Sequence, residues 1–183
     1  MRTLGPGSLA AILKLFLDFL YFGLWALLGL TSLIMLLMMA AGVYRLTGLG
    51  PELPDPVLQC LAMDVVLSLP LAAAAIVALL FIAGRLRRIF ATLIEGDPFV
   101  PENARHLRSI AIAIAIYQLI RYAAHGVVAM VFTLSGRPVE SGSSVQGEFT
   151  LNLGAWFAVI VLFVLAEVFR EGTRLRDEQK LTI

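Results

Sequence analysis

The chain has 183 residues, 60% of them hydrophobic, and its mean hydropathy is +0.90. Soluble domains contain about 45–50% apolar residues, so this composition excludes an ordinary water-soluble domain. The formal net charge is only +1, which gives no electrostatic reason to expect direct binding of nucleic acid. The single cysteine, Cys60, excludes an intrachain disulfide and a metal site built from the cysteines of one chain.

Four long apolar stretches follow one another along the chain, and we predict that each crosses a membrane as a helix. They are residues 16–44, 57–84, 110–134 and 153–169. Each has about 17 residues or more, close to the length that spans the hydrocarbon core of a bilayer. Too few polar faces remain to cover a large soluble core. The sequence therefore predicts an all-α fold, a four-helix transmembrane bundle that forms a single membrane domain over residues 1–183.

The basic residues predict the orientation of the spans, because Lys and Arg close to a helix end resist translocation. Four spans place both termini, and the segment between the second and third spans, on the same side of the membrane. Eleven basic residues fall on that side: Arg2, Lys14, Arg85, Arg87, Arg88, Arg105, Arg108, Arg170, Arg174, Arg176 and Lys180. Only Arg45 and Arg137 fall on the other side, and Arg121 lies within a span. We therefore expect both termini to be cytoplasmic.

The second span is expected to continue as a helix beyond the membrane. Past Gly84, the apolar residues Leu86, Ile89, Phe90 and Leu93 recur at helical spacing on one face, and basic and polar residues occupy the other. This pattern is typical of an amphipathic helix that lies against lipid or against a partner helix. We predict a cytoplasmic helix extension at this point.

Residues 92–107, TLIEGDPFVPENARHL, then interrupt the apolar pattern, and we name this segment the elbow. Gly96 suits a helix C-cap, and the residue before Pro98 is disfavoured in helical geometry. Pro101 fits the first turn of the next helix, and Phe99 can pin the turn onto apolar surface. Two interpretations stay open: the elbow is only a turn between two helices, or it also serves as a cytoplasmic docking site.

The third span opens with IAIAIAI, residues 110–116. Period-two alternation is typical of a strand, but an isolated strand cannot satisfy its backbone hydrogen bonds in lipid, so we predict a helix. The polar residues 135–150 separate the third span from the fourth. Their pattern is compatible with a small outer β-hairpin around Ser141–Ser144.

Polar side chains inside the spans are costly in lipid and are therefore functional candidates. Arg121 and His125 lie one turn apart in the third span, with Gln118 on an adjoining surface, and Asp64 lies at a similar depth in the second span. We predict that Asp64 pairs with Arg121, with His125, or with both. Such a cluster is either a clasp that fixes helix register or a water-lined site for a ligand or proton. A third alternative is that the predicted span boundaries place these residues deeper in the membrane than they really lie.

Two acids near the cytoplasmic interface are expected to reach water or to form ordinary ion pairs. Asp18 lies one turn from Lys14, and Glu167 lies close to Arg170. No phosphate-binding loop, metalloprotease motif, nucleophile elbow or paired-carboxylate motif occurs. We therefore expect no catalytic, cofactor-binding or metal-binding residues, and a protein that is not an enzyme.

Two cytoplasmic segments resemble a known family. The elbow has a G-x-P-F…N…L pattern, carried by Gly96, Pro98, Phe99, Asn103 and Leu107. Residues 165–183, which we name the tail, contain F-x-x-G-x-x-L-x-x-E-x-x-L-T-I, carried by Phe169, Gly172, Leu175, Glu178, Leu181, Thr182 and Ile183. Both patterns resemble those of an uncharacterised bacterial membrane family, catalogued as domain of unknown function 2975.

This resemblance implies four transmembrane helices in a bacterial inner membrane and carries over no catalytic residue. Members of the family are often encoded beside a small helix-turn-helix regulator. By association, the resemblance implies that the elbow and the tail dock or restrain such a regulator, while the bilayer and a second copy of the chain are further expected partners. The alternative function is a small transporter or membrane ligand sensor that uses Asp64, Arg121 and His125.

Overall fold

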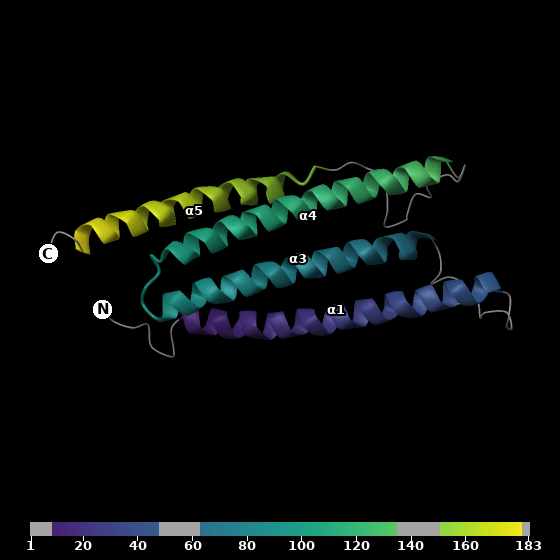
Figure 1. Cartoon of the computed structure of the whole chain (residues 1–183), viewed down its shortest axis with the longest axis horizontal. Helices are drawn as coiled ribbons and strands as arrows, with labels where there is room; N and C mark the ends of the chain where they lie inside the picture. The colour runs from purple at the N-terminus through teal and green to yellow at the C-terminus, as the bar shows by residue number, and fades with distance from the viewer. Residues whose placement is uncertain (1–8, 48–62, 135–150, 181–183) are drawn as a thin grey trace. The chain divides into compact units, whose positions relative to one another are not determined.

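The computed structural model describes residues 9–47, 63–134 and 151–180. Four helices make up nearly all of these residues (Figure 1): α1 (Leu9–Thr47), α3 (Met63–Ile94), α4 (Pro101–Leu134) and α5 (Leu153–Lys180). No strand occurs among the residues that the structure describes, in agreement with the predicted all-α class. The hairpin predicted around Ser141–Ser144 lies outside the described residues.

The helices are longer than the predicted spans. α3 continues past Gly84 to Ile94, as its amphipathic pattern predicts, and α4 begins at Pro101. The alternating residues 110–116 lie within α4 and are helical, because alternating isoleucine and alanine are both compatible with the apolar surface of a membrane helix. α5 continues past Phe169 through the charged part of the tail to Lys180.

All four helices are long and apolar enough to cross a membrane. The segments that qualify are Ile12–Tyr44, Ser68–Ile94, Pro101–Met130 and Leu153–Glu178. Along α1, Leu15, Phe19 and Phe22 are 72%, 80% and 67% exposed. So many exposed apolar side chains on one helix would be unfavourable in water, whereas lipid solvates them. The chain is therefore a multi-pass membrane protein.

The described chain divides into two compact units. The first unit takes in Met1–Trp25, Ala78–Gln118 and Leu151–Ile183, and the second takes in Ala26–Val77 and Leu119–Thr150. The elbow and the tail both belong to the first unit, so their contacts can be followed within one body.

The core of the first unit lies beside the elbow. Ile89 of α3, Leu107 and Ile110 of α4, and Ala166 of α5 are buried together, with Phe169 among the partly buried residues around them. Leu107 is the last residue of the elbow and Phe169 is the first aromatic residue of the tail. The core therefore ties three helices together at the end of the unit that carries both segments.

A polar contact joins α1 to α3 in the same unit. The carboxylate of Asp18 accepts a hydrogen bond from Nε of Arg87, and the Arg87 guanidinium lies 4.6 Å from the centre of the Tyr21 ring. The sequence suggested Lys14 as the partner of Asp18, but helix packing brings Arg87 to the carboxylate. Both side chains of the pair are about one-third exposed, Asp18 30% and Arg87 31%.

Candidate functional site: the joint between the elbow and the tail

The elbow begins with a helix ending that requires glycine. Gly96 has φ +83°, the left-handed region that side chains disfavour. Its N–H donates to the Leu93 carbonyl at 3.2 Å, and the N–H of Asp97 donates to the Thr92 carbonyl at 3.1 Å. These two bonds form a Schellman motif, which satisfies the last carbonyls of α3. The predicted C-cap at Gly96 is confirmed.

The buried side chain of Asn103 links α4 to the end of α3 and to the turn between them. Its side chain is fully buried, at 0% exposure. Its Nδ2 donates to Oγ1 of Thr92 at 2.7 Å and to the carbonyl of Pro98 at 2.9 Å. One amide on α4 therefore holds the end of α3 and the turn between the helices, and only a side chain with two donors can make both bonds.

Phe99 packs from the turn onto the tail. The ring centres of Phe99 and Phe169 are 5.6 Å apart, within the range of favourable aromatic pairs. The ring also covers Gly172 so closely that a Cβ added there would lie 2.8 Å from Cδ1 and 2.9 Å from Cε1 of Phe99. Glycine at position 172 is therefore what allows the elbow to rest on α5, and Phe99 pins the turn to apolar surface as the sequence predicts.

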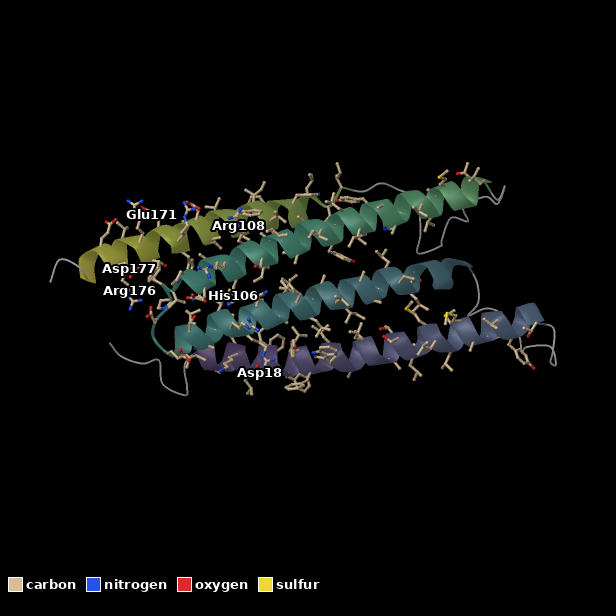
Figure 2. All side chains as sticks on the ribbon, viewed as in Figure 1. Asp18, His106, Arg108, Glu171, Arg176 and Asp177 are labelled. Carbon is tan, nitrogen blue, oxygen red and sulfur yellow. The ribbon has the colours of Figure 1, made fainter. Side chains whose placement is uncertain are left out.

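An ion pair closes the same contact on its polar side. NH1 of Arg176 donates to the carboxylate of Asp97 and lies 3.4 Å from the carbonyl oxygen of Phe99. In Figure 2, the Arg176 side chain leaves α5 on the side of the turn between α3 and α4. We name this set of contacts the joint: Asn103 inside the elbow, Phe99 on Phe169 and Gly172, and Arg176 on Asp97.

A further polar contact links α3 and α4 close to the joint. NH1 of Arg85 lies 3.3 Å from Nδ1 of His106, a residue labelled in Figure 2. A guanidinium has no acceptor atom, so Arg85 donates and Nδ1 carries no proton in this arrangement. The Arg85 guanidinium also lies 4.9 Å from the centre of the Phe81 ring.

A family model described as "Protein of unknown function (DUF2975)" matches residues 51–183, which is most of the chain. The chain belongs to this family. The match contains α3, α4, α5 and the whole joint, whereas α1 precedes it. No curated protein and no solved structure matches the chain.

In this DUF2975 protein, the elbow and tail residues singled out from the sequence divide into two groups by exposure. Asn103 and Leu107 are buried, at 0% and 8% exposure, and Gly172 is covered by Phe99. Phe99 and Leu175 remain 42% and 51% exposed. Phe99 thus takes part in the joint and still leaves part of its ring exposed, whereas Asn103 and Leu107 are enclosed.

The charged part of the tail forms the ion pairs that its spacing favours. Nε of Arg174 lies 3.1 Å from the Glu178 carboxylate and NH1 lies 3.4 Å from that of Glu171. Arg170 pairs with Glu167, as the sequence suggested. These pairs are exposed, and such pairs contribute about 0.2–1 kcal/mol each. Leu181, Thr182 and Ile183, the last residues of the tail pattern, lie outside the described residues.

The predicted intramembrane cluster is only partly described. Asp64 lies in α3, but the structure does not describe its side chain, so its pairing stays a prediction. Arg121 and His125 are half-buried on α4, and Nε of Arg121 and Nδ1 of His125 are buried with no hydrogen-bond partner among the described residues. Gln118 is 4% exposed, and its Oε1 is likewise without a described partner.

Within the described part of the chain, no three His, Cys, Asp or Glu side chains come together as metal ligands would. The sequence did not indicate two contacts that bring the elbow onto the tail, Phe99 on Gly172 and Arg176 on Asp97. The signal for the first was a glycine inside a helix without a turn nearby, which often marks a close approach of another segment. No local pattern indicates the second contact.

Proposed function

We propose that this DUF2975 protein is a non-enzymatic protein of the bacterial inner membrane that docks a cytoplasmic helix-turn-helix regulator on its joint. The observation that carries the proposal is that the elbow and the tail, which are far apart in sequence, share one packed surface. The asymmetry of basic residues supports a cytoplasmic position for this surface. The association of the family with regulators supports the kind of partner.

Two exposed apolar side chains, Phe99 in the joint and Leu175 next to Arg176 on α5, are suited to hold a partner. Leu175 stands on a helix end among charged residues and is 51% exposed, and the Phe99 ring is 42% exposed on a rigid support. Both side chains offer exposed apolar surface that a protein partner can cover. Because Phe99 already packs on Phe169 and Gly172, a partner loses little entropy in ordering its ring.

A matched pair of substitutions on α5 tests the proposal. Leu175 and Val168 are both exposed, at 51% and 56%, and their spacing of seven residues puts them on the same face about two turns apart. Val168 lies toward the membrane, and Leu175 lies in the charged tail. We expect Leu175→Ala to weaken capture of the regulator about tenfold or more, as loss of a central apolar contact does, and Val168→Ala to leave capture unchanged.

The measurement is recovery of a purified candidate helix-turn-helix protein on the full chain, gently solubilised from membranes. Equal amounts of each variant in the membrane fraction establish that insertion is intact. Equal recovery with wild type and Leu175→Ala would contradict docking on the joint. Equal recovery with wild type and with a chain that ends before residue 175 would exclude residues 175–183 of the tail from the docking surface.

A second function, a ligand sensor or small transporter, is favoured by the two buried nitrogen atoms of Arg121 and His125 that lack a described partner. Under this alternative, Arg121→Ala removes the response to a ligand and Leu175→Ala has little effect. If the cluster is instead a clasp, Asp64→Asn lowers the melting temperature in detergent. Unchanged melting of Asp64→Asn would argue against the clasp.

A further inference from the structure

A groove runs between α4 and α5 in the first unit, beside the joint. Its volume is about 770 Å³, within the range of sites for small molecules. Its walls include Phe163 and Ala166 of α5 and four arginines, Arg105, Arg108, Arg170 and Arg174. Figure 2 shows Arg108 on α4 beside α5.

The charge of the groove is unbalanced. Four arginines and two acids, Glu167 and Asp177, line it. Glu167 is already paired with Arg170, and Arg174 is paired with two acids of its own helix. Arg105 and Arg108 are exposed and form no ion pair or side-chain hydrogen bond with the residues that the structure describes. The groove therefore offers two adjacent guanidinium groups to an anion.

Along the helix axes, one end of the groove is apolar and the other end is polar. Leu107 and Ile110 pack against Ala166, which sets Arg108 and Arg105 of α4 beside the Ala166–Arg170 turn of α5. Phe163 lies one turn nearer the apolar middle of α5. Asp177 lies seven residues beyond Arg170, about 10 Å farther out along the helix.

We propose that this groove binds an anionic phospholipid of the adjacent leaflet, with the phosphate between Arg105 and Arg108 and an acyl chain along Phe163. Arginine binds phosphate oxygens through paired N–H donors, and basic pockets between membrane helices bind anionic head groups. Both walls belong to helices that qualify as membrane spans, so lipid has direct access. An acidic protein segment would gain the charge contacts but would not fill the apolar end of the groove.

The test uses the full chain purified in detergent and titrated with phosphatidylglycerol, with phosphatidylcholine as the uncharged comparison. Binding is measured by native mass spectrometry and by the shift in melting temperature. Each basic residue near an anionic lipid surface contributes about fivefold to affinity. We therefore expect R105Q/R108Q to bind phosphatidylglycerol about 25-fold more weakly than wild type and to bind phosphatidylcholine as wild type does.

Two further variants keep the result interpretable. R88Q removes an exposed arginine that lies on α3, outside the groove, and is expected to retain wild-type binding. R105K/R108K keeps the charge and should retain most of the affinity, which separates loss of charge from loss of folding. If R105Q/R108Q fails to fold, the comparison uses wild type and R105K/R108K. The proposal is then supported if both bind phosphatidylglycerol more strongly than phosphatidylcholine and if high salt abolishes this preference.

Three results would overturn it. The first is equal binding of phosphatidylglycerol and phosphatidylcholine by wild type. The second is an equal loss in R88Q and R105Q/R108Q, which would show a diffuse charge effect. The third is equal stabilisation by inorganic phosphate or glycerol phosphate, which would indicate a site for a soluble anion.

Discussion

Replacement of Gly172 by alanine tests the joint most sharply, because two opposing effects follow from a single methyl group. The new Cβ would lie 2.8 Å and 2.9 Å from two atoms of the Phe99 ring, whereas carbon atoms prefer about 3.5–4.0 Å. The ring would have to move away from α5. Its neighbours, Phe169 at a ring distance of 5.6 Å and the bond between Arg176 and the Phe99 carbonyl, oppose that movement.

The size of each effect can be estimated. Alanine stabilises a helix over glycine by about 1 kcal/mol. Displacing Phe99 loses an aromatic contact of about 0.5–1.5 kcal/mol and adds overpacking strain of about 1–3 kcal/mol. We therefore expect Gly172→Ala to destabilise the wild-type chain by about 2 kcal/mol. In a Phe99→Ala chain the ring that the new Cβ would meet is absent, so Gly172→Ala should stabilise that chain by about 1 kcal/mol.

The assay is a double-mutant cycle of the free energy of unfolding in mixed detergent micelles. The predicted coupling between Gly172→Ala and Phe99→Ala is about 3 kcal/mol, at the upper end of the range for residues in contact. Gly23, where an added Cβ meets nothing within 4 Å, provides the control, because Gly23→Ala should have one effect in both backgrounds. An effect of Gly172→Ala that is likewise the same in both backgrounds would refute the proposed contact.

Three other substitutions test the remaining contacts by the same unfolding measurement. Asn103→Ala should destabilise by about 2–3 kcal/mol, because it removes both hydrogen bonds of a fully buried amide; a change no larger than that of the exposed neighbour Glu102→Ala would contradict this. Gly96→Ala should destabilise by about 1–2 kcal/mol, because φ is +83° at this position, and a neutral effect would show that the helix ends differently. Asp18→Asn should destabilise by about 0.5–1 kcal/mol through the partly exposed pair with Arg87, and the loss should shrink at high salt.

Local chemistry made the elbow predictable from the sequence. Gly96, Pro98 and Pro101 restrict the backbone by themselves, so the end of α3 and the start of α4 could be placed without knowledge of the fold. The same holds for the ion pairs within the tail, since residues three or four apart on a helix always face each other.

Contacts between distant segments could not be predicted in this way. Asp97 and Arg176 are 79 residues apart, and Asp18 and Arg87 are 69 apart. The sequence suggested Lys14 for Asp18 because Lys14 is the basic residue one turn away. In lipid, moreover, almost every face of a helix is apolar, so hydrophobic periodicity does not indicate which face meets a neighbouring helix. For this reason the sequence did not indicate that Asn103 is buried and forms hydrogen bonds to Thr92 of α3 and to Pro98 in the turn.

The account depends most directly on the side of the membrane at which the joint lies. A reporter that fluoresces only in the cytoplasm and a phosphatase that is active only outside it, each fused after Ile183, measure this in intact cells. We predict a fluorescent C-terminal fusion and an inactive phosphatase at the same position. An active phosphatase after Ile183 would place the joint and its arginines outside the cytoplasm and would contradict the proposed docking of a cytoplasmic regulator.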